Sequence, residues 1–260
     1  MKKRLSKFII LVIVAALTVG SFIYAKNAYV VPVLMYHSID NNDHTTKLSV
    51  SPESFARQME FLSKNHYNVV GLEKIAVYMQ KKEKMPPRTV AITFDDGFMN
   101  NYEYAYPVLK RHSLPATIFM IVDKIDHPGW LSWKELKEMS DSGVITIGSH
   151  TKSHPWLTST DDRVLKYELE ESKKILENGL GRPVNFLCYP FGMYDDRVKK
   201  AAKDAGYLCA VTTDPGRFKT NSDIYAIKRV RISRTADNLF VFWIKTCGWY
   251  TWVKEHRDRV

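Results

Sequence analysis

The sequence predicts one α/β domain whose parallel sheet closes into a barrel. Short apolar runs rich in β-branched residues alternate with amphipathic helical segments at least six times over about 220 residues. This alternation is typical of parallel strands that are joined by helices. A chain of 260 residues, 45% of them hydrophobic, can bury a sizeable core. A barrel accounts for the length and the repetition better than an open sheet does.

The strands are indicated by apolar runs that are continuous rather than alternating, as expected for strands buried on both faces. These runs are residues 29–36, 90–94, 115–122, 144–148, 184–188 and 208–212. The more polar segment 225–232 is expected as a last strand. Polar residues follow several of the runs directly. Because the active residues of such barrels lie at the carboxyl ends of the strands, these polar residues are the candidates for a site.

Helices are indicated between the strands by apolar spacing and by capping residues. Ser51 and Pro52 suit the start of one helix, and Ser132 with Glu135 forms a capping box at the start of another. The expected helices are residues 51–62, 72–80, 101–112, 132–142, 160–178, 195–206 and 236–246. The aromatic segment 236–260 is expected to pack on the barrel as a C-terminal helix, and a membrane-interface contact is its alternative.

The N-terminal segment 1–28 is predicted to be a signal peptide or a membrane anchor. Residues 1–7 carry four basic side chains, and residues 8–25 are almost wholly apolar. About 18 apolar residues just span a bilayer, with the positive flank on the cytoplasmic side. Ile23 stands where a cleavage site needs a small residue, which favours an uncleaved anchor. The remainder is therefore expected at the extracellular face of the membrane or secreted.

The net charge of the chain limits the partners that are expected for it. The formal net charge of +10 is dispersed, which indicates either a solvated basic surface or attraction to an anionic polymer or membrane. No basic patch with interleaved aromatic residues occurs, so nucleic acid is not an expected partner.

Cys188, Cys209 and Cys247 form no spacing motif. Buried thiols are favoured over a disulfide between Cys188 and Cys209, and a monomer is expected.

Two adjacent carboxylates, Asp95 and Asp96, follow the strand 90–94 within the sequence Thr-Phe-Asp-Asp-Gly. Like charges raise each other's pKa, so the pair needs a strong partner to stay ionised, and a bound cation would serve. The alternative is an Asp-Gly turn that caps the next helix. The two carboxylates alone do not decide between a turn and a catalytic site.

Two histidines four residues apart, His150 and His154, follow the strand 144–148. A helical turn or a tight loop would place both within reach of one ion. Two imidazoles and one carboxylate leave open positions on Zn²⁺ or a similar cation, which is the arrangement of a catalytic site. The second aspartate would then be free to act as a base on water.

Three motifs, taken together and in this order, resemble those of the polysaccharide deacetylases (carbohydrate esterase family 4). They are residues 93–97, residues 149–154 (Ser-His-Thr-Lys-Ser-His) and residues 189–192 (Tyr-Pro-Phe-Gly). Residues 32–38 are similar to the start of the branch that deacetylates poly-N-acetylglucosamine. The resemblance covers about residues 32–232 and implies a deacetylase domain over 29–235. The implied fold is a distorted, incomplete (β/α) barrel of about seven strands.

The resemblance also implies roles for the residues of the first two motifs. Asp95 is the expected general base. Asp96, His150 and His154 are the expected ligands of a divalent metal, with Zn²⁺ favoured and Co²⁺ or Ni²⁺ also suitable. The implied reaction removes N-acetyl groups from N-acetylhexosamine units of a cell-envelope or extracellular polysaccharide, with a metal-bound water as nucleophile.

The third motif implies a backbone donor for the acetyl carbonyl. The N–H of Phe191 is the expected donor, because Pro190 has no N–H. Tyr189 and Pro190 are expected to contact the substrate, and Leu157 is a candidate for the acetyl pocket. Trp130, Trp133 and Trp156 flank the histidine motif in the sequence. They are expected to pack in the core or at helix starts, and a platform for a sugar ring is the alternative.

Two departures from the family pattern leave the partner of the catalytic aspartate and the general acid unassigned. Cys188 stands where many members have the arginine that holds the catalytic aspartate, and residues 229–233 lack the late histidine that serves as general acid. His37, or Asp95 once protonated, is then the candidate proton donor. Two other functions remain open: an O-acetyl polysaccharide esterase of the same fold, and a catalytically weak glycan-binding envelope protein.

Overall fold

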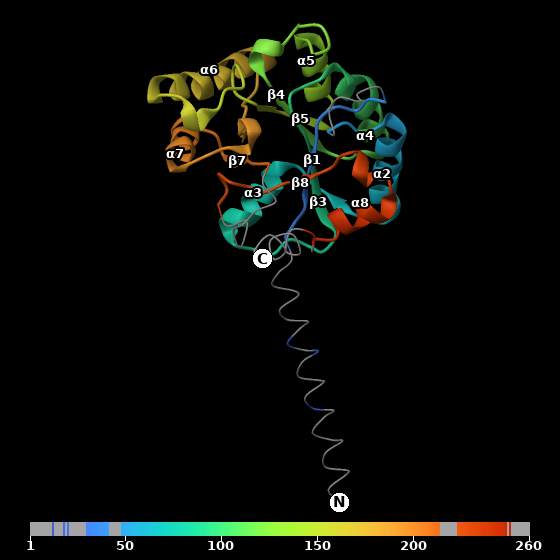
Figure 1. Cartoon of the computed structure of the whole chain (residues 1–260). Coiled ribbons are helices and arrows are strands. Elements are labelled where there is room, and N and C mark those ends of the chain that lie inside the picture. Colours follow the sequence, from blue (N-terminus) through green and yellow to red (C-terminus); the bar gives the residue numbers. More distant parts are fainter. Residues whose placement is uncertain are drawn as a thin grey trace, which may run out of the picture.

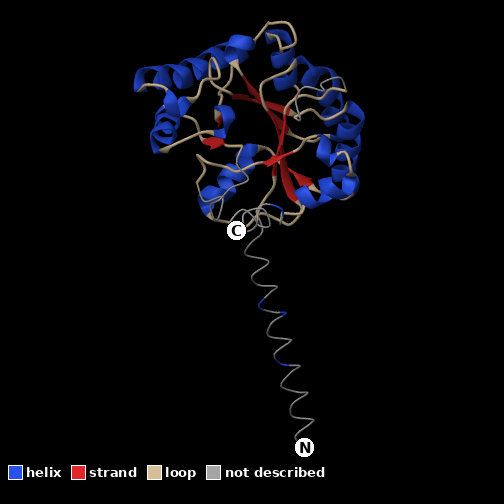
Figure 2. Ribbon diagram, viewed as in Figure 1, coloured by secondary structure: helices blue, strands red, loops and turns tan. Residues whose placement is uncertain are grey.

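The computed structural model describes residues 30–41, 48–213 and 223–248, with the single positions 12, 18, 20 and 250. Within these residues the strands form one parallel sheet in the order β7-β6-β5-β4-β3-β1-β8, with β2 beside β3. The sheet curls into an open half-barrel that helices surround (Figures 1 and 2). The expected distorted, incomplete barrel is confirmed.

The strands lie within or close to the predicted apolar runs, but most are shorter. They are β1 (Val33–Tyr36), β2 (Asn68–Val69), β3 (Thr89–Phe94), β4 (Ala116–Met120), β5 (Ile145–Ser149), β6 (Phe186–Cys188), β7 (Cys209–Val211) and β8 (Val230–Arg231). The short strand β2 was not predicted, because two residues carry no periodicity. An isolated bridge between Val211 and Ile227, together with a hydrogen bond from the Ala210 N–H to the Ile224 carbonyl at 2.9 Å, links β7 to the segment before β8.

The predicted helices are present, with one difference in the third, which contains α4. They are α2 (Pro52–Lys64), α3 (Leu72–Lys81), α4 (Tyr106–His112), α5 (Trp133–Asp141), α6 (Asp162–Leu180), α7 (Asp196–Asp204) and α8 (Leu239–Thr246). The segment expected as one helix over 101–112 begins with a π-helical turn, Asn101–Ala105, before α4. Pro107 explains the change, since it has no N–H to continue the α-helical hydrogen bonds. The capping box of Ser132 and Glu135 is confirmed.

The core fixes the strand ends that carry the site. Tyr36 and Phe94, at the ends of the paired strands β1 and β3, stack with ring centroids 5.3 Å apart. Phe55 of α2 packs edge-on against Tyr36, also at 5.3 Å. The Tyr36 hydroxyl donates to Gln58 Oε1 at 2.8 Å, so its buried polar atom is satisfied. The residues that follow these strand ends therefore start from a rigid base.

The cysteines are free thiols, as favoured by the sequence. Cys209 of β7 pairs in register with Phe186 of β6, and Cys188 pairs with Val211. The two thiols therefore lie two register positions apart on neighbouring strands rather than opposite each other. Burial raises the pKa of Cys209 to about 12 and keeps this thiol protonated.

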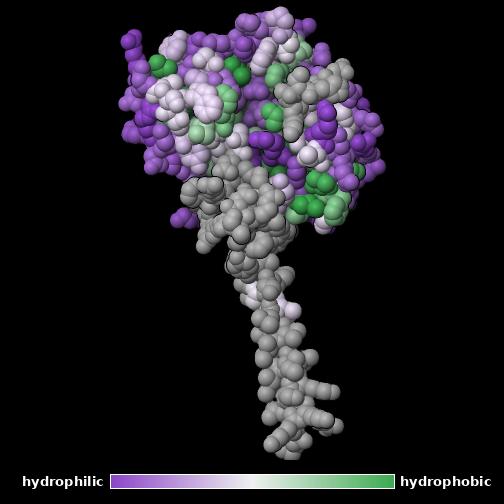
Figure 3. Space-filling view, viewed as in Figure 1, coloured by the Kyte–Doolittle hydropathy of each residue, from purple (hydrophilic) through white to green (hydrophobic). Residues whose placement is uncertain are grey.

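Helix α8 packs against α2 and leaves part of its apolar surface open. Phe242 contacts Phe61 of α2 edge-on at 5.9 Å, while Phe240 and Trp243 are exposed. Hydrophobic side chains gather over this helix in the space-filling view (Figure 3).

The predicted N-terminal segment 1–28 lies outside the continuously described residues, as does the tail from 251 on. The described helices include none that is long and apolar enough to cross a membrane.

The chain enters the described domain beside the end of α8. The N–H of Val30 donates to the carbonyl of Gly248 at 3.1 Å. Val30 precedes the first residue of β1, so this contact lies at the amino-terminal edge of the sheet. The opposite edge, where the strands end, carries the polar cluster described next.

Candidate active site

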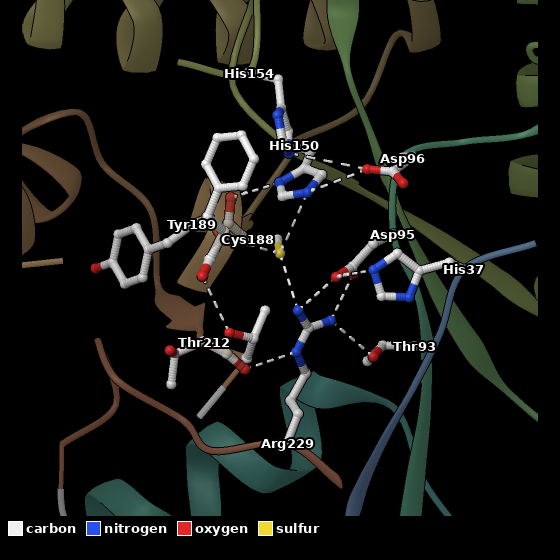
Figure 4. A network of polar contacts seen from close by, with 12 residues as sticks. His37, Thr93, Asp95, Asp96, His150, His154, Cys188, Tyr189, Thr212 and Arg229 are labelled. Carbon is white, nitrogen blue, oxygen red and sulfur yellow. Dashed lines mark hydrogen bonds and ion pairs between the residues drawn. The ribbon is translucent and has the colours of Figure 1, made fainter. Parts of the chain in front are cut away.

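The Asp-Gly turn after β3 directs two carboxylates into the site. Asp96 and Gly97 both adopt left-handed backbone conformations, with φ of 73° and 85°. A side chain at Gly97 would collide with Met120 of β4, so glycine is required there. The N–H of Gly97 donates to the carbonyl of Asp95 at 2.9 Å. Residues 95–97 therefore form a turn, but neither aspartate caps the next helix, whose N-cap is Asn100. The turn instead presents Asp95 and Asp96 at the strand end (Figure 4).

Asp95 is held by a bidentate ion pair with Arg229. The Arg229 Nη1 and Nη2 atoms lie 2.6 Å from Asp95 Oδ1 and Oδ2, and both side chains are buried. The guanidinium also donates to the Thr212 carbonyl at 2.9 Å and to Thr93 Oγ1 at 3.1 Å. Burial alone would raise the pKa of Asp95, but the charge and hydrogen bonds of Arg229 outweigh it and hold that pKa well below its usual range. Asp95 is therefore an ionised carboxylate.

The sequence did not reveal this partner of Asp95. Cys188, the last residue of β6, stands where an arginine was expected, but Arg229 reaches the same carboxylate from the segment before β8. Arg229 Nη2 also donates to Cys188 Sγ at 3.1 Å. The available signal was the three cations Lys228, Arg229 and Arg231 within the predicted strand 225–232. A cation that is buried in such a strand needs a buried anion as its partner.

The second carboxylate lies beside both histidines. Asp96 Oδ1 is 3.5 Å from His150 Nε2 and 3.9 Å from His154 Nε2. His150 Nδ1 is 2.8 Å from the Cys188 carbonyl, so this nitrogen donates and Nε2 keeps its lone pair. Thr151 and His154 both have positive φ, and the loop is a tight turn rather than a helix. One ligand atom from each of the three residues lies within 4.8 Å of the others.

Electrostatics suit these three residues to a divalent cation. Burial and the negative charge of Asp95 raise the pKa of Asp96 to about 7. Burial lowers the pKa of His150 to about 3, and it also lowers that of His154. In the described part of the chain, no lysine or arginine forms an ion pair with Asp96. Two neutral imidazoles and a carboxylate without a cationic partner form a donor set that fits a metal ion.

A second group with metal-ligand spacing, Asp95, His150 and Cys188, is less suitable. Arg229 already binds both oxygens of Asp95. Burial raises the pKa of Cys188 well above its usual value, and a protonated thiol is a poor ligand. The guanidinium would also repel a cation at this position.

His37 lies at the edge of the same cluster. Its Nε2 is 3.8 Å from Asp95 Oδ2, which is beyond hydrogen-bond distance. Its Nδ1 is buried and has no hydrogen-bond partner among the residues that the structure describes. Burial lowers the pKa of His37, so the ring is neutral near pH 7. The structure brings this candidate to the site, next to Asp95.

The third motif forms a turn whose residues differ in exposure. The N–H of Gly192 donates to the Tyr189 carbonyl at 2.9 Å, and Phe191 has φ of 58°. Tyr189, Pro190 and Leu157 are buried beneath the site, whereas Phe191 is exposed. The Phe191 N–H has no acceptor among the described residues. It is thus available to a ligand.

Comparisons with known proteins agree with the motifs and the fold. The family model for polysaccharide deacetylase matches residues 82–210. A Bacillus subtilis protein named as a polysaccharide deacetylase, YxkH, is 37% identical over 202 residues, which are 78% of this chain and 71% of that protein. A Staphylococcus aureus poly-β-1,6-N-acetyl-D-glucosamine N-deacetylase is 30% identical over 201 residues, 72% of this chain and 69% of the relative.

Solved structures give the same result. The Streptococcus pyogenes deacetylase PplD, solved with acetate, superposes with a TM-score of 0.76 at 27% identity, covering 84% of this chain and 99% of that one. The Bacillus cereus polysaccharide deacetylase BC0361 gives 0.71 at 38% identity, over 82% and 68% of the two chains. Fold and site thus define a carbohydrate-modifying hydrolase. The chain belongs to the polysaccharide deacetylase family and is an enzyme of that class.

Proposed function

We propose that the protein is a metal-dependent hydrolase that removes N-acetyl groups from N-acetylhexosamine units of a cell-envelope or extracellular polysaccharide. One observation carries the proposal: the ionised Asp95, held by Arg229, lies next to the donor set Asp96, His150 and His154. A base and a metal site side by side are what hydrolysis of an unreactive amide needs. The name of the S. aureus relative supports a β-linked N-acetylglucosamine polymer as the substrate.

The metal would be held by Asp96 Oδ1, His150 Nε2 and His154 Nε2. When bound, such an ion polarises a carbonyl oxygen and lowers the pKa of water. The mixed nitrogen and oxygen donors favour Zn²⁺, and they also accept Co²⁺ or Ni²⁺. The hydrogen bond from His150 Nδ1 to the Cys188 carbonyl fixes the tautomer and leaves Nε2 free to bind a metal ion.

Separate residues of the chain accept the proton of water, stabilise the negative charge on the acetyl oxygen and return a proton to the leaving nitrogen. A carboxylate oxygen of Asp95 accepts the proton that the attacking water loses, and Arg229 keeps this carboxylate ionised beforehand. The N–H of Phe191 donates to the acetyl oxygen as negative charge develops there. The C–N bond breaks as the leaving nitrogen takes a proton, which Asp95 returns. His37, 3.8 Å from Asp95, is the second candidate for this proton transfer.

Acetate release from N-acetylglucosamine oligomers tests this function. The metal-loaded protein is expected to release acetate, and chelation is expected to lower the rate by at least about 100-fold until Zn²⁺ is restored. A rate that survives chelation contradicts the metal-dependent mechanism. Faster release from O-acetylated xylan would identify an esterase. Glycan binding without acetate release, with any of the three metals added, would identify a binding protein.

Metal affinity is expected to fall as the pH drops below about 7, by up to about tenfold per unit. The cause is Asp96, whose pKa of about 7 in the metal-free protein means that a proton competes with the ion. Zinc titrations between pH 5.5 and 8 measure this dependence.

The variant Asp96→Asn serves as the control for this pH dependence. It is expected to bind zinc more weakly at pH 8 and to lose most of the pH dependence. Burial lowers the pKa values of His150 and His154, so the imidazoles contribute little to it in this range. If the variant kept the full pH dependence, Asp96 would not be the titrating ligand.

A further inference from the structure

Two large aromatic side chains remain exposed beside the site. Trp156 is 52% exposed and Phe191 is 45% exposed. Their rings are stacked, with centroids 4.4 Å apart and an angle of 16° between the planes. Neighbouring exposed aromatic rings mark a surface that binds something.

This aromatic pair continues outward from the proposed metal ligands. The edge-to-face contact between Phe191 and His154 has a centroid distance of 4.6 Å. His154 in turn contacts the ring of His150 at 4.6 Å. The rings therefore form a connected path from the reacting centre to Trp156. A polymer whose acetyl group lies at the histidines would have a neighbouring unit within reach of Trp156.

The Phe191 side of the pair is held by the turn that carries it. Gly192 has φ of 70°, and a side chain there would collide with Thr213. Thr213 Oγ1 donates to the Phe191 carbonyl at 3.2 Å, and Thr212 Oγ1 donates to the Gly192 carbonyl at 2.8 Å. The exposed ring therefore stands on a turn with a defined conformation.

The backbone that follows Trp156 is held by hydrogen bonds from Arg197 of α7. This guanidinium donates to the carbonyls of Leu157 and Thr158, at 3.2 Å each, and to that of Thr160 at 2.9 Å. Leu157 is fully buried and anchors the same short turn. Both rings are thus in place before a ligand arrives, so binding costs little conformational entropy.

We propose that Trp156, stacked on Phe191, is a platform for the sugar unit next to the one that is deacetylated. The C–H face of a pyranose ring is flat and apolar while its hydroxyl groups lie at the rim, and an exposed indole face complements such a surface. The ligand class is therefore a chain of at least two linked N-acetylhexosamine units. This inference rests on the proposed function, because it takes the acetylated polymer as the substrate.

Kinetics with substrates of different length test the platform. Trp156→Ala is expected to raise KM for an N-acetylglucosamine pentamer by about tenfold with kcat within about twofold, because it removes binding shared by ground and transition states. The same variant should leave kcat/KM for the monosaccharide unchanged. Trp156→Phe is expected to keep most of the affinity. Trp243→Ala on α8, also an exposed tryptophan, is the matched control and should match the parent.

A binding measurement separates this proposal from the proposed function. In the Asp95→Asn background, where turnover is blocked, tryptophan fluorescence is expected to change on addition of the pentamer. The change should disappear with Trp156→Ala and persist with Trp243→Ala.

The two proposals fail in different ways. Pentamer affinity unchanged by Trp156→Ala, or an equal loss with monosaccharide and pentamer, overturns the platform even if acetate is released. Binding that depends on Trp156 in a protein that releases no acetate overturns the proposed function and leaves the platform standing.

Discussion

Replacing Arg229 with methionine is expected to lower kcat by about 10²- to 10³-fold and to destabilise the fold by about 3–5 kcal/mol. The buried Asp95 carboxylate would lose both hydrogen bonds of 2.6 Å and its counter-charge. Arg57→Met is the matched control, since Arg57 pairs with Glu53 at the surface of α2 and such pairs contribute about 0–1 kcal/mol. Thermal unfolding and acetate release measure the two effects.

The pH profile of Arg229→Met distinguishes a positioning residue from a merely structural one. Without the guanidinium, burial and the charge of Asp96 would raise the pKa of Asp95, so the acid limb of kcat/KM should move to higher pH. Arg229→Lys is expected to restore part of the rate and part of the profile. In the parent the pKa of Asp95 is lowered, so the pair stabilises the fold above about pH 4 and loses this effect as the pH falls further. An unshifted acid limb in Arg229→Met would contradict the role.

Replacing Asp95 with asparagine is expected to lower kcat by about 10³-fold or more, because the amide cannot take a proton from water. Zinc affinity should change little, since the three proposed ligands are retained. Asp204→Asn, at an exposed ion pair with Lys200, is the control and should be fully active. Acetate release and zinc titration give the two readouts.

The double variant Asp95→Asn with Arg229→Met addresses the stability of the pair. Asp95→Asn alone leaves a buried guanidinium without its counter-charge and should lower the melting temperature. The double variant is expected to recover part of this loss and none of the activity. A kcat within tenfold of the parent for Asp95→Asn would show that another group is the base.

Most of the fold and the local motifs could be predicted, because their signals lie within short stretches of sequence. Apolar runs indicated the strands, and the pair His150 and His154 was recognised from its own spacing and its place after a strand. Asp95 and Asp96 were found in the same way. Each of these signals depends on neighbours along the chain, where periodicity and turn chemistry act.

Arg229 could not be predicted as the partner of Asp95, because the two residues are 134 positions apart. The contact depends on the order of the strands, in which β8 lies beside β1 and β1 lies beside β3. A guanidinium on a long side chain can also reach one carboxylate from different strands, so its sequence position is weakly constrained. The stacked pair of Trp156 and Phe191 likewise joins two loops that are separate in sequence.

The hydrogen bond between Val30 and Gly248 joins the two ends of the described domain. It lies at the amino-terminal edge of the sheet, whereas His37, directly after β1, lies at the catalytic edge. The four residues of β1 separate the two edges by about 13 Å. Tethering the protein to a support through either end of this domain should therefore leave the substrate entrance facing away from the support and open to long polymers.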